Sequence, residues 1–215
     1  SKAFETISAD LPNTPKEVNL SLVSYLAKAC VDVCEGQILD IRMAESQKIS
    51  SESQYIKMVE KKTAALFQVS CAMGAICANT KKKDVANLSS FGKNLGIAFQ
   101  IVDDLIGIVG DSKITKKPVG NDIREGKKSL PILLAINRAK TKDKETILNA
   151  FGNSSVSKEE LELAVKTIRS MGIETIVRKK AMQYSNAARK SLSSYSTSSR
   201  KDLLSLLDFV VKRSL

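Results

Sequence analysis

The chain has 215 residues, of which 43% are hydrophobic and 27% charged, and its 34 basic and 23 acidic residues give a net charge of +11. It contains no histidine, which excludes imidazole-dependent catalytic triads, HExxH metalloproteases and the usual zinc-binding spacings. No apolar run reaches the roughly 18 residues of a membrane-spanning helix and no apolar leader opens the chain, so we expect neither a transmembrane segment nor secretion. The positive charge favours an anionic partner, and four irregularly spaced cysteines favour a reducing cytoplasm.

Apolar residues recur with helical spacing, and no segment alternates for long with the period of a β-strand, so the sequence predicts an all-α fold in a single domain. We expect helices over residues 1–9, 17–46, 51–78, 84–109, from 130 onward, 157–171, 173–193 and 200–213. Ser51 with Gln54, and Ser157 with Glu160, have the spacing of capping boxes. No capping residue precedes the first helix, so we expect it to be the end of a longer one.

In the helix predicted over 17–46, polar residues interrupt the stripe that we expect to face the core. Leu26, Cys30 and Ile41 mark this stripe, Gln37 falls on it, and Asp40 lies three residues after Gln37. Each polar side chain could simply satisfy a backbone group in the core. The four cysteines, Cys30, Cys34, Cys71 and Cys77, are expected to pack as core residues.

The helix predicted over 51–78 carries Lys62 in the middle of its inward stripe, followed by Thr63. The apolar residues of that stripe are Tyr55, Met58, Leu66, Val69 and Met73. A lysine in this position either extends its amine to solvent or meets an anion.

On the helix predicted over 84–109, an amide and two carboxylates share one face. Gly96, Gln100, Asp103 and Gly107 follow one another at steps of four, three and four residues, with Asp104 beside them. Carboxylates flanked by apolar residues need a cation, which can be a lysine or a divalent metal. A purely structural ion pair is the alternative.

Glycines mark two further features. Gly92 and Gly96, one turn apart, predict the close approach of a neighbouring helix. Between Gly110 and Lys128 lies a long irregular segment whose glycines and lysines could hold a phosphate, although it has neither a Walker A sequence nor a GxGxxG motif.

Taken together, FQIVDDLIGIVGD followed by KPVGNDIREGKKSLP, with EGQILD and KKTAALF ahead of them, resembles the trans-isoprenyl diphosphate synthase (polyprenyl synthetase) family. The resemblance covers essentially the whole chain and is greatest to geranylgeranyl diphosphate synthases. It implies an isoprenoid-synthase helical bundle around a central cavity and a homodimer. It also implies Mg²⁺-dependent condensation of an allylic diphosphate with isopentenyl diphosphate, giving geranylgeranyl or farnesyl diphosphate.

The resemblance also assigns site residues. Asp103 and Asp104 belong to the second aspartate-rich motif, which would bind Mg²⁺, with Asp122 helping through a water. The allylic diphosphate would be held by Lys62, Thr63, Gln100, Lys117 and Lys127. Of these, Lys62, Thr63 and Gln100 would also act in catalysis, by stabilising the departing diphosphate or the allylic cation. Gln37 and Asp40 would line the cavity near the reacting carbons.

Two departures from the family pattern shape the expectation. The third acidic position of the second motif is Gly107, as in geranylgeranyl-type synthases. The first aspartate-rich motif and the arginine-containing isopentenyl diphosphate site have no counterpart in these residues. We therefore expect the C-terminal part of a synthase, without its N-terminal helices and inactive by itself.

Two alternatives to a synthase remain. One is a non-catalytic partner subunit or a terpene cyclase relative, and the retained set of acids and lysines argues against it. The other is a basic nucleic-acid-binding module, but the chain has only six phenylalanines, four tyrosines and no tryptophan for stacking on bases. We expect no nucleic-acid partner.

Overall fold

The computed structural model describes residues 2–9, 15–109 and 119–212, and every regular element in those ranges is a helix, which confirms the all-α prediction. The helices are α1 (Lys2–Ser8), α2 (Lys16–Glu45), α3 (Glu52–Val59), the π-helical segment η1 (Glu60–Ala64), α4 (Ala65–Cys77), α5 (Lys82–Val109), α7 (Asn121–Arg124), α8 (Leu130–Arg138), α9 (Thr141–Ala150), α10 (Lys158–Ser170), α11 (Ile173–Ser191) and α12 (Thr197–Lys212).

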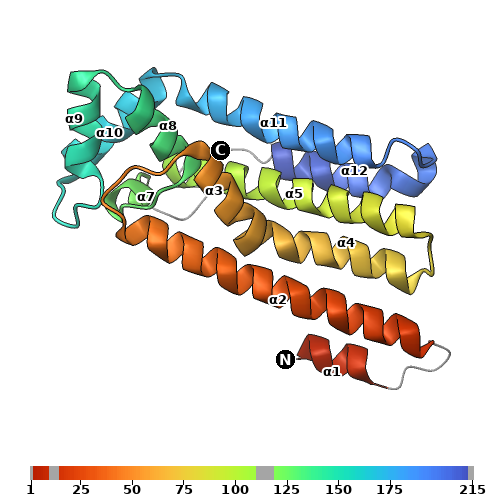
Figure 1. Ribbon diagram of the computed structural model, residues 1–215. Helices are drawn as coiled ribbons and strands as arrows, with labels where there is room; N and C mark the ends of the chain where they lie inside the picture. Colours follow the sequence, from red (N-terminus) through yellow and green to blue (C-terminus); the bar gives the residue numbers. More distant parts are fainter. Residues whose placement is uncertain (1, 10–14, 110–118, 213–215) are drawn as a thin grey trace.

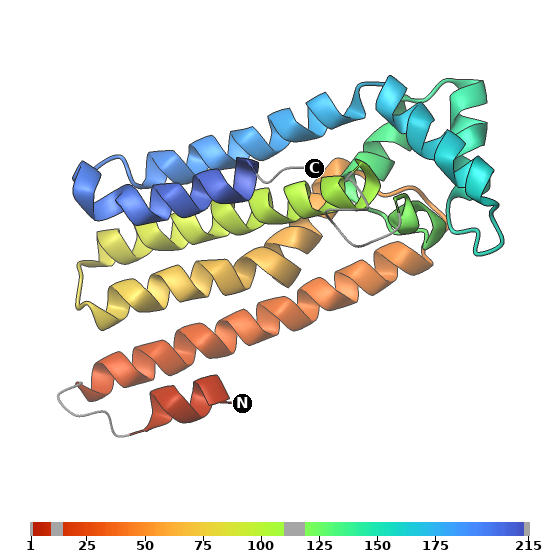
Figure 2. The ribbon, with the colours of Figure 1, turned by 180° about the vertical axis from the view of Figure 1, so that it is seen from behind.

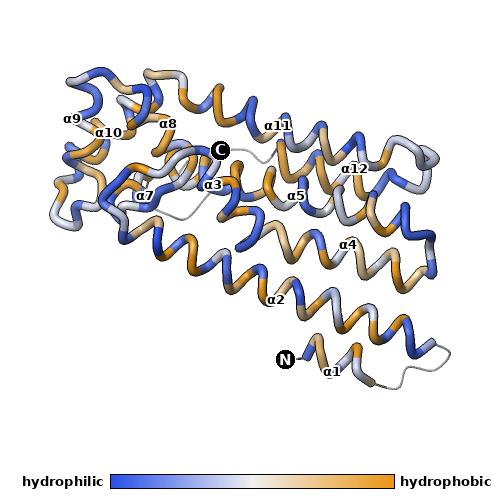
Figure 3. Tube along the Cα trace, in the orientation of Figure 1, coloured by the Kyte–Doolittle hydropathy of each residue, from blue (hydrophilic) through white to orange (hydrophobic). Residues whose placement is uncertain are grey.

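The long helices lie side by side, with α5 between α4 and α11 and with α2 against α4 on the other side (Figures 1 and 2). Helix α12 packs on α5 and α11, and the short helices α7 to α10 gather at the end where α5 finishes. Hydrophobic residues recur along each long helix (Figure 3). The main core cluster combines buried side chains of α3, α5, α8, α10 and α11, so α5 is the central helix of the fold.

Both predicted capping boxes are present. The Ser51 hydroxyl accepts the backbone N–H of Gln54 while the Gln54 side chain accepts the N–H of Ser51, and Ser157 and Glu160 repeat the arrangement. These reciprocal bonds satisfy donors that a helix N-terminus leaves without partners. They fix where α3 and α10 begin.

The helix predicted over 51–78 is interrupted by η1, and directly after it the buried face differs from the prediction. Tyr55 and Met58 are buried as predicted, but Leu66, predicted to face inward, is 48% exposed. A π turn contains one residue more than the helical period allows, so the side chains after it are rotated about the axis. Ala65 is buried there instead, and Val69 is buried as predicted.

The inward face of α2 also differs from the prediction. Cys30 and Ile41, predicted to face the core, are exposed, and Ala29 and Gly36 are among the buried residues instead. Alanine and glycine contribute little to hydrophobic periodicity, so a helix face of small residues that packs closely against another helix is not recognised as buried. The expectation that the cysteines form core residues is wrong for three of the four: Cys30, Cys34 and Cys77 are exposed and Cys71 is partly buried.

In the described ranges, none of the helices combines the length and apolar character needed to span a bilayer. The predicted irregular segment between Gly110 and Lys128 is described only from residue 119 onward, where it contains the short helix α7.

Candidate functional site

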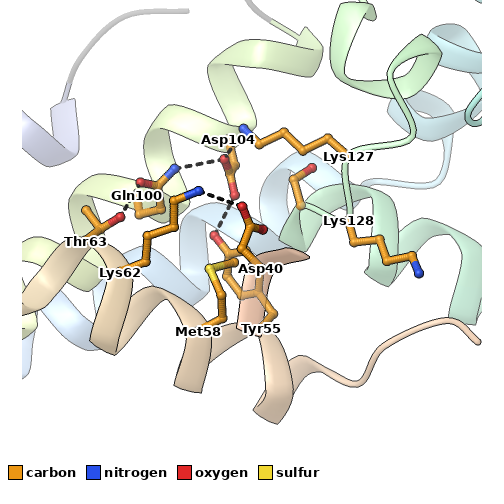
Figure 4. Close-up of a pocket in the computed structure, with 10 residues that line it drawn as sticks. Asp40, Tyr55, Met58, Lys62, Thr63, Gln100, Asp104, Lys127 and Lys128 are labelled. Carbon is orange, nitrogen blue, oxygen red and sulfur yellow. Dashed lines mark hydrogen bonds and ion pairs between the residues drawn. The ribbon is translucent and has the colours of Figure 1, made fainter. Parts of the chain in front are cut away.

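A pocket of about 120 Å³ lies where the C-terminal half of α5 meets α2, α3, η1 and the segment that follows α7 (Figure 4). Its lining residues are Asp40, Tyr55, Met58, Lys62, Thr63, Gln100, Asp104, Lys127, Lys128 and Ser129. The carboxylates of Asp40 and Asp104 and the amines of Lys62 and Lys127 meet in this small space, so the pocket can accommodate charged groups.

Asp104 is the buried centre of this pocket, with 2% of its side chain exposed. One of its oxygens accepts the Tyr55 hydroxyl at 2.7 Å, and the other accepts Gln100 Nε2 at 3.0 Å and Lys127 Nζ at 2.8 Å (Figure 4). Burial raises the pKa of Asp104, against the opposing effect of Lys127. Burial and the neighbouring carboxylate hold the pKa of Tyr55 well above its ordinary value, so this hydroxyl remains a donor.

Lys127 connects the buried carboxylate to the surface. Its amine also lies 3.2 Å from Asp122 Oδ2, on α7. Burial works against the charged amine, but the attraction of Asp104 and Asp122 outweighs it and raises the pKa of Lys127. With 43% of its side chain exposed, Lys127 is a charged amine that can reach a ligand.

Segment η1 presents two polar side chains to the same pocket. Lys62 forms an ion pair with Asp40 of α2 at 2.6 Å, each side chain being 36% exposed. Thr63 donates its hydroxyl to Gln100 Oε1 at 2.9 Å, and Gln100 in turn donates to Asp104. The helices α2, η1 and α5 are therefore joined by polar contacts inside the pocket.

The family of this chain follows from its similarity to known proteins. Residues 1–168 match the family described as polyprenyl synthetase. The chain belongs to the polyprenyl synthetase family. A geranylgeranyl diphosphate synthase of Sulfolobus acidocaldarius is 37% identical over 186 residues, which are 86% of this chain and 56% of that protein. The chain spans about half the length of the curated relatives it matches.

Solved structures of polyprenyl synthetases share the fold. The geranylgeranyl pyrophosphate synthetase of Pyrococcus horikoshii superimposes with a TM-score of 0.87 at 32% identity, over 99% of this chain and 64% of that one. The geranylgeranyl pyrophosphate synthase of Corynebacterium glutamicum, complexed with isoprenyl diphosphate and magnesium, gives 0.84 at 27% identity, over 93% of this chain and 57% of that one. The helical arrangement is thus that of the isoprenoid synthases, as predicted.

The structure brings most of the predicted polyprenyl synthetase residues together. Those that line the pocket are Asp40, Lys62, Thr63, Gln100, Asp104 and Lys127. Asp122 contacts Lys127 at its edge, and Asp103 adjoins Asp104 on α5 and is partly buried. Gln37 is exposed on α2 and does not line this pocket, and Lys117 lies outside the described residues.

Four residues that line this pocket were not predicted to belong to it: Tyr55, Met58, Lys128 and Ser129. Tyr55 appears in the sequence as one more apolar residue of an inward stripe, and only its contact with Asp104 shows that its hydroxyl matters. Lys128 is buried and points away from the other pocket residues (Figure 4). It donates to the backbone carbonyls of Met43, Ser46 and Lys48 at the end of α2, the last at 3.3 Å.

The carboxylates predicted to bind Mg²⁺ do not form a closed metal site by themselves. Within residues 2–9, 15–109 and 119–212, no group of three or more acidic or cysteine side chains is arranged to hold a metal ion. Carboxylate oxygens are nevertheless the donors that Mg²⁺ prefers, and Mg²⁺ usually takes only one or two of them together with substrate phosphates and water. The donor set fits a metal that arrives with a diphosphate.

Proposed function

We propose that this chain carries the allylic-diphosphate half of a trans-isoprenyl diphosphate synthase. The complete enzyme would condense an allylic diphosphate with isopentenyl diphosphate to give geranylgeranyl diphosphate, or the shorter farnesyl diphosphate. The observation that carries the proposal is the pocket in which Lys62 and Lys127 are each paired with a carboxylate. The relatives named geranylgeranyl diphosphate synthase support the product class.

The internal ion pairs give a physical reason for joint binding of a diphosphate and a divalent cation. Lys62 is neutralised by Asp40, and Lys127 by Asp104 and Asp122. An anionic diphosphate alone would draw the lysines away and leave the acids uncompensated, and a cation alone would leave the lysines uncompensated. Binding both exchanges one set of ion pairs for another, so each is expected to strengthen the other.

Within that exchange each predicted residue has a role. Lys62 and Lys127 would turn to the diphosphate oxygens, and the exposed fractions of their side chains leave room for this. Thr63 and Gln100 would place oxygen dipoles beside the allylic carbons, with Gln37, Asp40 and Lys117 as further contacts to the substrate. Asp103, Asp104 and Asp122 would hold Mg²⁺, which supplies Lewis-acid stabilisation of charge on the departing diphosphate.

Calorimetry with inorganic diphosphate, with and without Mg²⁺, tests the proposal on this chain. We expect binding with Mg²⁺ and much weaker binding without it. Lys62→Met should raise Kd by about tenfold or more, because a charge-assisted hydrogen bond contributes about 1.5–3 kcal/mol. The side chains of Lys62 and Asp40 are both more than a third exposed, and such an ion pair adds little to stability, so the thermal midpoint Tm should change little.

Lys190→Met is the matched control, because Lys190 is an exposed lysine of α11 that does not line the pocket. It should bind diphosphate like the unaltered chain. Equal loss in both variants would show that net positive charge, not this pocket, attracts diphosphate. No Mg²⁺-dependent binding by the unaltered chain would contradict the proposal.

Gly107 and Asp122 give a second test of the metal role. A Cβ atom at Gly107 would lie 2.6 Å from Asp122 Oδ2, so the Asp122 carboxylate occupies the space of the missing third acid. Gly107→Ala must therefore displace this carboxylate. We expect the Mg²⁺-dependent Kd for diphosphate to rise about tenfold, the usual cost of disturbing a group that orients a metal site.

Supplying the third acid makes the test sharper. Gly107→Asp should also weaken binding, because two carboxylates would compete for one space, whereas Gly107→Asp combined with Asp122→Ala should recover it. Improved binding by Gly107→Asp alone would show that Asp122 does not replace the missing acid.

We further propose that the complete enzyme is a homodimer in a reducing cytoplasm and that this chain alone does not transfer prenyl groups. Exposed apolar side chains along α2, including Leu20, Val31 and Ile38, offer a surface for another chain. Three exposed cysteines without disulfide partners fit a reducing compartment.

A further inference from the structure

The π-helical segment η1 is held between two glycines from different helices. On α2, a Cβ atom at Gly36 would lie 2.6 Å from Lys62 Cα, closer than side chains approach a backbone. On α5, a Cβ atom at Gly96 would lie 2.6 Å from Ala64 Cα. Each glycine lets its helix approach the backbone of η1 more closely than any other residue would allow.

The side chains of η1 continue this arrangement. Glu60 pairs with Lys93 of α5, and Thr63 bonds Gln100 of α5. Lys61 forms ion pairs with two acids of α2, Asp32 at 3.0 Å and Glu35. Lys62 forms an ion pair with Asp40 of the same helix. All four polar residues of η1 are thus bound to one of the two helices that carry the glycines.

A π turn is uncommon and persists where the surroundings impose it. Its extra residue sets the rotation of Lys62 and Thr63 about the helix axis, so it decides whether these side chains reach the pocket. In an uninterrupted α-helix the residues on one side of η1 would turn away from their present partners.

We infer that Gly36 and Gly96 are positioning residues for the diphosphate site, acting through η1. The inference rests on the proposed function, because it assigns the two glycines to the same pocket. Neither glycine touches the ligand. Each fixes the distance from its helix to η1, and together they hold Lys62 against Asp40 and Thr63 against Gln100.

The test compares Gly36→Ala and Gly96→Ala with Gly92→Ala in calorimetry with inorganic diphosphate and Mg²⁺. Gly92 has the same close approach on α5, with its Cβ position 2.8 Å from the Phe67 carbonyl carbon, but it meets α4 beyond η1. All three variants should lower Tm. Only Gly36→Ala and Gly96→Ala should raise Kd by about tenfold or more, because small misplacements of binding groups have large effects.

A stabilised background keeps the variants folded. Gly74 is in the interior of α4, and a Cβ atom there would meet nothing within 4 Å, so Gly74→Ala should raise Tm by about 2 °C without changing Kd. All three substitutions are made in this background. If Gly36→Ala and Gly96→Ala fail to fold there, the two glycines determine the fold and the positioning role is overturned.

The remaining outcomes are also decisive. Unchanged diphosphate binding in Gly36→Ala and Gly96→Ala overturns the inference and leaves the proposed function standing. Equal loss of binding in all three variants, in proportion to Tm, shows a general packing effect and also overturns it. Absence of binding in the unaltered chain removes the proposed function, and the inference with it.

Discussion

Asp104→Ala is expected to lower the free energy of unfolding by about 3 kcal/mol, the low end of the cost of breaking a buried ion pair. Lys127, which loses its partner, keeps 43% exposure and can turn to Asp122 or to water, and for this reason we take the low end. The Tyr55 hydroxyl cannot turn to water in the same way, because Tyr55 is fully buried and Asp104 is its acceptor. Leaving a buried donor without an acceptor costs about 1–3 kcal/mol.

Urea unfolding followed by circular dichroism measures this loss. Asp104→Asn keeps an acceptor for Tyr55 and removes the charge, so it should lose less stability than the alanine variant. Asp103→Ala, the same change at the next position of α5, should cost less because Asp103 is only partly buried. A loss below about 1 kcal/mol for Asp104→Ala, which is the size of one ordinary hydrogen bond, would contradict the role of Asp104 as the structural centre of the pocket.

A double-variant cycle with Tyr55→Phe separates the two contributions. Tyr55→Phe removes the donor but leaves Asp104 bonded to Gln100 and Lys127, so it should cost about 1 kcal/mol. Residues in direct contact show coupling of about 0.5–3 kcal/mol. Independent effects of the two substitutions would show that their hydrogen bond contributes little.

Much of the fold was predictable because local rules act on it directly. The Ser51–Gln54 pair indicates where α3 begins. Gly92 and Gly96 indicate where another helix comes close, and Phe67 and Ala64 of the preceding helical segments do lie against them. Such features depend on a few neighbouring residues and on sterics. Sequence spacing alone is enough to find them.

The π turn could not be predicted in this way. The residues from Glu60 to Ala64 are ordinary helix formers, so nothing in their composition distinguishes a π turn from an α-helical turn. The turn is imposed by contacts with α2 and α5, which lie far away in the sequence. For the same reason Leu66 was placed on the wrong face.

The resemblance to the family assigned the site residues, and the helical pattern independently marked some of them as unusual. Lys62, Gln100 and Asp104 are polar residues on apolar stripes, and the structure places all three in one pocket. Tyr55 does not interrupt the apolar pattern of its helix, because a tyrosine fits an apolar stripe as well as a phenylalanine does. Its role depends on the atom that its hydroxyl meets, and that atom belongs to another helix.

The adjacent lysines Lys127 and Lys128 show the limit of composition as a guide. Both lie in the non-helical segment between α7 and α8, where successive side chains point in different directions. Lys127 faces Asp104, and Lys128 reaches the backbone carbonyls that end α2. Two adjacent lysines thus have different structural roles: Lys127 contacts the pocket carboxylate, and Lys128 bonds a helix terminus.

Lys128→Met is therefore expected to lower the free energy of unfolding by about 2 kcal/mol. The amine supplies charged donors to carbonyls that the end of a helix leaves without partners, and each such bond contributes about 1.5–3 kcal/mol. Burial lowers the pKa of Lys128, which shows that taking its charge from water carries a cost and offsets part of the gain. Lys48→Met is the control, because it removes an exposed lysine from the same turn and keeps the Lys48 carbonyl.

The effect of Lys128→Met should extend to the pocket. Lys128 anchors the backbone next to Lys127 to the end of α2, so its loss frees the segment that aims Lys127 at Asp104. We expect diphosphate affinity in the presence of Mg²⁺ to fall together with stability, and neither to change in Lys48→Met. Lost stability with unchanged affinity would mean that Asp104 and Asp122 suffice to place Lys127, and that the anchor serves only the end of α2.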